Sequence, residues 1–194
     1  MENIEAGGRI NLSKAAPGLK RVRVGLGWKA NSFDGSPFDL DASVFMCKAD
    51  ADGNPRLISN AHFIFFNNKT SPDGAVVHAG DNRNGDVDGD DETIIVDLDK
   101  ISVEATELSI VVTIHEALAR KQNFGKVRDS YVKIYNDETG EILAKHSLEE
   151  DSSEAAALQF GSLYKLDGQW RFKAVGAGYK KGLDAFVGIY GGTV

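Results

Sequence analysis

The stretch Leu158–Ala174, LQFGSLYKLDGQWRFKA, decides the fold class. Large apolar residues alternate with polar ones on both sides of Asp167 and Gly168, as they do in strands that bury one face. An Asp-Gly pair between alternating runs favours a two-residue type I′ turn, because both turn positions need positive φ. The stretch therefore predicts an antiparallel β-hairpin.

The same period of two recurs along most of the chain. The segment 108–114 is apolar at nearly every position, which predicts a central strand covered on both faces. The five residues Asn136 to Gly140 separate two further alternating runs and predict a second hairpin. Strands are expected at residues 22–26, 40–47, 62–66, 94–98, 108–114, 131–135 and 142–144.

Two short helices are expected among these strands. Residues 116–123 contain good helix formers and stop before Gly125. Near the C-terminus, four apolar residues fall at positions i, i+3, i+4 and i+7 and form one stripe: Leu183, Phe186, Val187 and Tyr190. Residues 1–194 are therefore predicted to form one mainly-β domain, a β-sandwich of two antiparallel or mixed sheets with a few short helices, including one at the C-terminus.

The net charge of −7 is concentrated in one place. Between Asp81 and Glu92, six carboxylates face one arginine, which gives a local charge of −5. A nucleic-acid-binding protein would need the opposite sign, with Lys and Arg clustered on one face. The charge pattern therefore argues against nucleic acid as a partner.

The chain has one cysteine, Cys47, which reads as a half-buried strand residue. A single thiol forms no internal disulfide, and there is no thiol cluster for zinc. The first residues lack the pattern of a secretion signal, and no apolar run approaches the roughly 20 residues that span a bilayer. We therefore expect a cytoplasmic protein, and contact with the inner face of the membrane is left open.

The acidic stretch offers oxygen donors almost exclusively, from carboxylates, asparagine amides and backbone carbonyls. Two carboxylates about 4 Å apart repel by about 4 kcal/mol at an effective dielectric constant of 20, so a compact loop needs a counterion. Hard oxygen ligands suit Ca²⁺ or Mg²⁺. Ca²⁺ accepts more ligands in looser geometry, and the glycines allow the backbone to turn tightly around it. A solvated acidic turn that binds nothing is the simpler interpretation.

An EF-hand is the obvious comparison, and it fails. Residues 84–89 match the opening of that loop, but Ile95 stands where the bidentate glutamate should be. Further ligands must come from other segments. Asp39 and Asp41 share one face at the start of a strand, and Glu116 follows the end of the predicted central strand. If these strand ends meet the acidic stretch, up to two ions could be held.

Two other functions are considered. In a metal-dependent hydrolase or phosphatase, two ions in the acidic cluster would activate water and His115 or Glu116 would act as a base. In direct thiol chemistry, Cys47 would react as a thiolate, although only Lys48 lies beside it as a basic neighbour. The sequence contains no nucleophile elbow and no phosphate-binding glycine loop.

Six strings spread along the chain are distinctive: GLGW at 25–28, FDLDASVF at 38–45, FNNKTSPDGAVVHAGDNRNGDVDGDDE at 66–92, VVTIHEA at 111–117, RKQNFGKV at 120–127 and FGSLYKLDGQWRFKAVGAGY at 160–179. Together they resemble the TerD family, which implies a calcium-binding β-sandwich without established enzymatic activity. The resemblance also implies a bacterial role in resistance to tellurite and other chemical stress, in assemblies with other TerD-family proteins and the membrane protein TerC.

Carried over position by position, the resemblance implies a set of calcium ligands. The chain departs from the family pattern at Asn84, Asp86 and Val87, where the family usually has Thr, Glu and Gly. Val87 is stiffer than glycine and resists positive φ. The implied ligands, for about two ions, are Asp39, Asp41, Asn67, Asp81, Asn82, Asp86, Asp88, Asp90, Asp91, Glu92 and Glu116.

Overall fold

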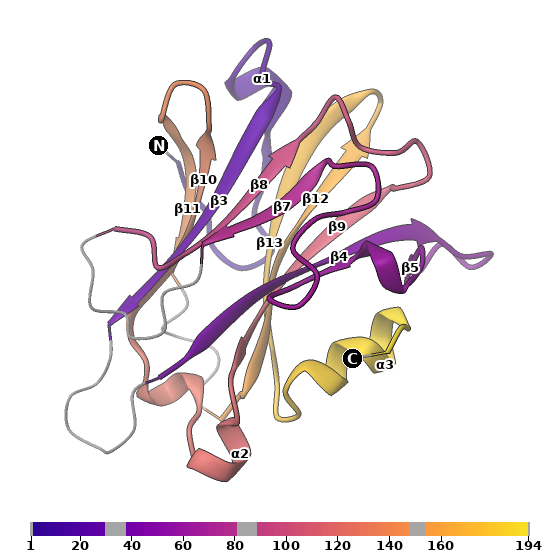
Figure 1. Cartoon of the computed structure of the whole chain (residues 1–194). Coiled ribbons are helices and arrows are strands. Elements are labelled where there is room, and N and C mark those ends of the chain that lie inside the picture. Colours follow the sequence, from indigo (N-terminus) through magenta and orange to yellow (C-terminus); the bar gives the residue numbers. More distant parts are fainter. Residues whose placement is uncertain (1, 30–37, 81–88, 148–153, 194) are drawn as a thin grey trace.

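Two sheets packed face to face form the body of the protein (Figure 1). The computed structural model describes residues 2–29, 38–80, 89–147 and 154–193. The first sheet has the order β1 (Glu2–Asn3), β11 (Ile142–Ser147), β10 (Arg128–Asn136), β3 (Arg21–Lys29), β8 (Glu92–Asp97) and β7 (Val76–Gly80). The second has the order β2 (Arg9–Asn11), β13 (Gln169–Tyr179), β12 (Ala157–Leu166), β9 (Glu107–Ile114), β4 (Leu40–Ala49) and β5 (Pro55–Leu57), and β6 (Phe63–Ile64) also pairs with β4.

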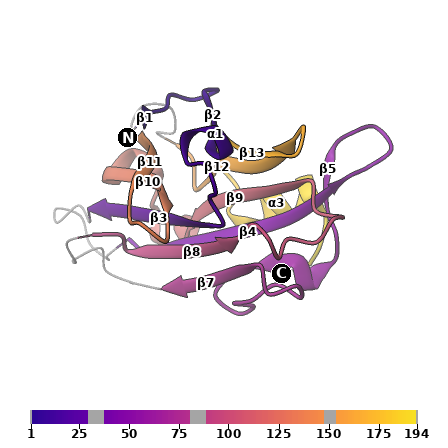
Figure 2. The ribbon, with the colours of Figure 1, turned by 90° about the horizontal axis from the view of Figure 1, so that it is seen from above.

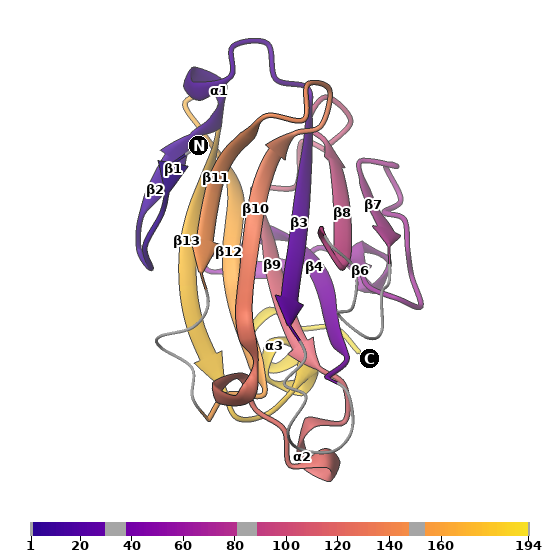
Figure 3. The same ribbon diagram turned by 90° about the vertical axis from the view of Figure 1, so that its left-hand side faces the viewer.

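The predicted β-sandwich is confirmed. Strand β1 pairs with β11 in parallel and the other ladders are antiparallel, so the first sheet is mixed. Seen from above in Figure 2, strands of the two sheets overlap, whereas Figure 3 shows β10, β3 and β8 of the first sheet in front of β12, β9 and β4 of the second. Alternate residues of β3 and β4 point into the space between them and are buried: Val22, Val24, Leu26, Leu40, Ala42, Val44 and Met46.

A second, smaller core lies on the outer face of the second sheet, under helix α3 (Leu183–Tyr190). Phe186 and Tyr190 of the helix pack against Phe45 and Val111 of the sheet. The hydroxyl oxygens of Tyr190 and Ser109 lie 2.8 Å apart, which satisfies both buried groups. Strand β9 is therefore covered on both faces, as its continuous apolar run predicts.

Both predicted hairpins are present. Strands β12 and β13 pair in antiparallel register around Asp167 and Gly168, whose φ values are 52° and 72°. Both φ values are positive, as a type I′ turn requires. Strands β10 and β11 form the second hairpin.

The predicted helix at residues 116–123 is shorter in the structure. Helix α2 covers only Ala117–Arg120, because Glu116 and Lys121 on either side adopt left-handed φ values of 52° and 53°. Leu118 remains 76% exposed, so the segment buries little apolar surface, and helices of this length are marginal without tertiary packing. The remaining helices are α1 (Leu12–Ala15) and two single 3₁₀ turns at Asn60–His62 and Phe124–Lys126.

Strand β7 was not predicted, because the sequence from Asn67 to Glu92 reads as one continuous acidic loop. In the structure the segment instead contributes an edge strand to the first sheet. The acidic residues therefore lie in the connection between two neighbouring strands, β7 and β8. The expected strand at 62–66 is likewise shortened to β6, after a 3₁₀ turn.

One end of the sandwich gathers the strand ends that matter for function. The register pairs Leu26 with Glu92 in the first sheet and Leu40 with Ile114 in the second. Figure 1 shows the end of β3, the start of β4 and helix α2 at this end, and Figure 3 shows the same grouping from the side. The fold thus brings Asp39, Glu116 and the exit of the acidic stretch to one end of the molecule.

Candidate functional site

Asp90 lies against the outer face of the first sheet. Its Oδ2 is 3.0 Å from Nη1 of Arg23, and its Oδ1 accepts a hydrogen bond from the Tyr135 hydroxyl at 3.0 Å. The Tyr131 hydroxyl lies 3.2 Å from the same Oδ1 and 2.8 Å from the Gly89 carbonyl oxygen, so its proton is shared between two acceptors. The Asp90 side chain is only 6% exposed. Burial raises the pKa of both tyrosines above the usual value, and the Asp90 carboxylate raises it further.

Gly25 on β3 makes room for this arrangement. A Cβ at that position would collide with the Asp90 carboxyl group. The absence of a side chain on the outer face of β3 therefore allows Asp90 to lie flat on the strand. The glycine is required here for space, because its φ is not in the left-handed region.

Asp91 forms two hydrogen bonds with the same strand, β3. Its amide donates to the carbonyl oxygen of Leu26 at 2.6 Å, and its Oδ2 accepts from the amide of Trp28 at 3.0 Å. Asp91 is 5% exposed. The residue thus extends the hydrogen bonding between β3 and β8 by one residue before the start of β8.

Glu92 points inward, between the two sheets. Its Oε2 lies 2.9 Å from Nε2 of His78 on β7 and accepts from the amide of Ala42 on β4 at 3.3 Å. Both the His78 and the Glu92 side chains are almost fully buried. On β4, the residues that pair with β6 are Val44 and Phe45. Ala42 lies outside this pairing, and the Glu92 carboxylate accepts the hydrogen bond of its amide. Glu92 therefore links the first sheet to the second.

The other described members of the predicted ligand set lie elsewhere. The Asp39 carbonyl accepts from the His115 amide at 2.8 Å, and Asp41 Oδ2 lies 3.9 Å from His115 Nδ1. The Glu116 carboxylate pairs with Arg120 at 2.9 Å. Asn67 is exposed in a turn after β6. Four predicted ligands, Asp81, Asn82, Asp86 and Asp88, lie outside the described residues.

Apart from Asp39, the described carboxylates of the predicted ligand set therefore fall into two groups. Asp90, Asp91 and Glu92 lie at the start of β8 and accept bonds from the protein itself. Asp41 and Glu116 line a pocket on the outer face of the second sheet. Among the residues that the structure describes, no three His, Cys, Asp or Glu side chains come close enough to hold a metal ion. The oxygen donors suit Ca²⁺ by type, and a complete site would require ligands from residues 81–88.

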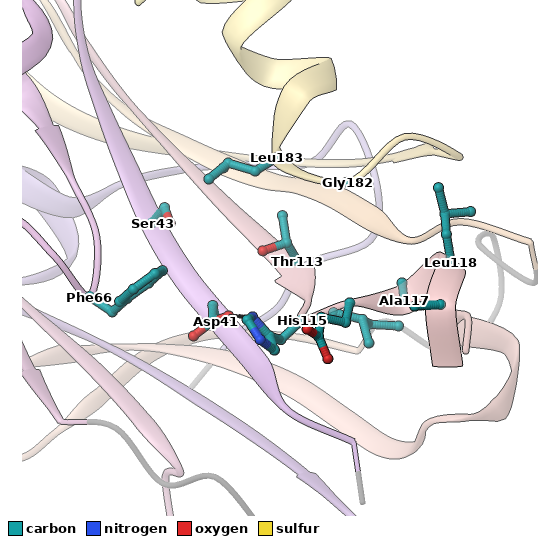
Figure 4. A pocket seen from close by; sticks show the side chains of 12 residues that line it. Asp41, Ser43, Phe66, Thr113, His115, Ala117, Leu118, Gly182 and Leu183 are labelled. Carbon is teal, nitrogen blue, oxygen red and sulfur yellow. Dashed lines mark ion pairs between the residues drawn. The ribbon is translucent and has the colours of Figure 1, made fainter. Parts of the chain in front are cut away.

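The outer pocket has a volume of about 440 Å³ (Figure 4). Its floor is formed by strands β4 and β9, and its walls by Phe66 and by the beginnings of α2 and α3. No prediction from the sequence included Ser43 and Thr113 in this floor, or His78 beside Glu92. The alternation of residues 41, 43 and 45 does place Asp41 and Ser43 on one face, but the pairing of β4 with β9 is not encoded locally.

Comparisons with known proteins agree over nearly the whole chain. The TerD domain family model matches residues 1–190. The tellurium resistance protein TerD of Serratia marcescens is 46% identical over 189 residues, which cover 97% of this chain and 96% of that protein. General stress protein 16U of Bacillus subtilis is 44% identical over 190 residues, covering 97% and 96%. A crystal structure of a TerD homologue from Streptomyces coelicolor A3(2) superposes with a TM-score of 0.71 at 26% identity, covering 87% of this chain and 95% of that one.

Proposed function

Since the chain belongs to the TerD family of tellurium-resistance and stress-response proteins, we propose that it is a calcium-binding, non-catalytic module of that response. One observation carries the proposal. The exit of a stretch with a local charge of −5 is pinned to the sandwich by three buried carboxylates. Because this end of the stretch is fixed, a compact arrangement of its other carboxylates would be repulsive, and a divalent cation would relieve that repulsion.

The predicted ligands then divide by role. Asp90, Asp91 and Glu92 are anchors, because their oxygens already accept bonds from side chains and amides of the sandwich. The ions are held mainly by Asp81, Asn82, Asp86 and Asp88, which lie outside the described residues. Asp39, Asp41, Asn67 and Glu116 remain predicted ligands. Up to two Ca²⁺ ions are expected in total.

The surroundings of His115 do not favour acyl transfer by a serine or threonine nucleophile. Its distance of 3.9 Å from Asp41 exceeds that of a hydrogen bond. In the described part of the chain, no serine or threonine hydroxyl is bonded to His115. A nucleophile and a base in contact, as acyl-transfer chemistry requires, are therefore not assembled there.

Partners and location follow the family proposal. The protein would act in the bacterial cytoplasm with other TerD-family proteins and, at the inner face of the membrane, with TerC. Within the described ranges, no helix has the length and apolar character needed to cross a bilayer. Binding of purified TerC in detergent, with calcium and with chelator, tests this part of the proposal.

Isothermal titration and thermal unfolding together test calcium binding. We expect heat on addition of Ca²⁺ and a higher melting temperature with Ca²⁺ than with EDTA, and a smaller effect with Mg²⁺. The double variant Asp86→Asn with Asp88→Asn should lose both effects. Glu104→Gln, which removes one exposed carboxylate elsewhere, is the matched control. No heat at millimolar Ca²⁺, with equal melting temperatures, would refute the proposal.

A further inference from the structure

Two lysines lie side by side on the outer face of the first sheet. Lys133 of β10 and Lys145 of β11 are register partners, so their side chains leave the same face of the sheet. In the described part of the chain, neither ammonium group forms an ion pair or a hydrogen bond. Like charges directly opposite each other destabilise a pair of strands. The contacts of the fold therefore give no reason for this pair.

The ring of Tyr131 brings the two ammonium groups together. The Nζ atom of Lys133 lies 4.0 Å from the ring centroid, and the Nζ atom of Lys145 lies 5.3 Å from it. A Cβ at Gly27 would collide with this ring, so the ring lies against β3. Both lysines are half-buried, with their stems along the sheet. The two charges are thus positioned in advance, which lowers the cost of ordering them around a ligand.

The contact with the ring leaves both positive charges uncompensated. An aromatic ring carries no net charge, and each ammonium group has three N–H donors. Asp90, the carboxylate that Tyr131 contacts, is already balanced by Arg23 at 3.0 Å. On its other side, Lys145 pairs with the neutral Asn3 of β1. Two positive charges therefore remain free here, in a chain whose net charge is −7.

Charge and spacing select a compact dianion. Both ammonium groups lie within 5.3 Å of one ring centroid, so a single ligand group can contact both. A phosphate monoester carries about −1.5 to −2 charges at neutral pH and has three strong acceptor oxygens. Lysine binds such groups as a point charge. Figure 3 shows β11, β10 and β3 facing the viewer, with no helix over the middle of these strands.

We infer that Lys133 and Lys145 bind a phosphate monoester, whose oxygens accept bonds from both ammonium groups beside the Tyr131 ring. The monoester belongs either to a small soluble compound or to a lipid headgroup, which share this chemistry. The site lies on the first sheet, whereas the outer pocket lies on the second. The inference does not depend on calcium binding, and its test is made in EDTA.

The test titrates the full chain with glycerol 3-phosphate at constant ionic strength and follows the amide shifts of Lys133 and Lys145. We expect saturable shifts at millimolar ligand. Dimethyl phosphate, a diester with a single charge, should bind at least about fivefold more weakly. Lys133→Met and Lys145→Met should each weaken binding by about fivefold or more. Lys165→Met is the matched control and should change nothing, because this lysine lies alone over the Trp170 ring at 5.7 Å.

A second arm separates the two sources of the monoester. It measures cosedimentation with phosphatidylcholine vesicles that contain either phosphatidic acid, a monoester, or phosphatidylglycerol, a diester. Binding of glycerol 3-phosphate supports a soluble ligand, and lysine-dependent binding of phosphatidic acid vesicles alone supports a lipid.

The methionine variants should keep or raise the melting temperature, because they remove a repulsion between like charges. Loss of binding therefore cannot come from unfolding. The inference is overturned if neither monoester binds, or if the diesters bind equally well. It is also overturned if Lys165→Met weakens binding as much as Lys133→Met does.

Discussion

Asp90 lies 3.0 Å from the guanidinium of Arg23, on the outer face of a sheet and almost fully buried. Both oxygens of this carboxylate are engaged, one by Arg23 and the other by two tyrosine hydroxyls. Contacts with Arg23 on β3 and with two tyrosines on β10 hold this carboxylate in place. We therefore expect Asp90 to stabilise the fold and not to bind an ion.

Asp90→Asn should lower the free energy of unfolding in EDTA by about 1–3 kcal/mol, because the charge-assisted contact with Arg23 is lost. Calcium affinity of the folded variant should change little. Asp88→Asn should do the reverse, with weaker calcium binding and an unchanged stability in EDTA. Urea unfolding and calcium titration on both variants measure the two effects. Loss of calcium binding in a folded Asp90→Asn protein would show that Asp90 is a ligand.

Gly25→Ala should destabilise the protein by about 1–3 kcal/mol, since the added Cβ displaces the Asp90 carboxyl group. Gly188→Ala is the matched control, because Gly188 lies exposed in α3 with open space around its Cβ position. Alanine is the better helix former, so this variant should gain up to about 1 kcal/mol. Chemical denaturation of both variants gives the comparison. Equal free energies of unfolding for the two variants would mean that the Asp90 side chain moves aside at no cost.

The buried pair His78 and Glu92 should be strongly coupled, because the two side chains lie 2.9 Å apart on the neighbouring strands β7 and β8 and are almost fully buried. In a double-mutant cycle with His78→Gln and Glu92→Gln, we expect an interaction free energy of about 1–3 kcal/mol. The exposed pair Lys180 and Glu154, cycled with Lys180→Gln and Glu154→Gln, serves as the control and should show no measurable coupling. If the changes in unfolding free energy caused by His78→Gln and Glu92→Gln simply add, the two residues are not coupled and the prediction is wrong.

Alkaline conditions should destabilise the sandwich through Tyr131 and Tyr135. Burial, together with the nearby Asp90 carboxylate, raises the pKa of both phenols above the usual value of 10.0. The unfolded chain therefore loses these protons first, so their contribution is complete below pH 10 and declines as the pH rises further. Urea midpoints between pH 8 and 11 should fall less steeply in the double variant Tyr131→Phe with Tyr135→Phe. An identical pH dependence would rule out these tyrosines as the source.

Cys47 should be inert to thiol reagents while the protein is folded. It is fully buried between β4 and α3, deeper than the half-buried strand position expected from sequence. Burial, with a smaller contribution from Glu107, raises the pKa of its thiol to about 12. Reaction with Ellman's reagent at pH 8 should be slow in buffer and fast in urea, and Cys47→Ala should leave tellurite resistance unchanged. Rapid labelling of the folded chain would reopen direct thiol chemistry.

Much of the fold could be predicted because its signals are local. The Asp167–Gly168 turn and the apolar run of β9 each specify their own structure, and the C-terminal stripe specifies α3. Strand β7 was missed because only Val76 and Val77 mark it within a polar segment. The helix after Glu116 was predicted too long because helix propensity alone does not show that Leu118 remains exposed.

The candidate site was predictable only in its composition. The sequence shows that carboxylates are concentrated before β8, but not that Asp90 folds back onto Gly25 or that Glu92 turns inward to His78. These contacts join residues far apart in the chain, through strand pairings that no short motif encodes. The outer pocket depends in the same way on β4 lying beside β9.

The acidic stretch connects two strands that already pair with each other, β7 and β8. For a flexible connection, each doubling in length costs only about 0.6 kcal/mol of closure entropy. We therefore expect insertions, deletions and charge changes at residues 81–88 to cost the two sheets little, in contrast to changes at Asp90 or Asp91. Descendants of one ancestral gene could gain or abandon ion binding here within a few substitutions and still fold, which would let duplicated copies specialise.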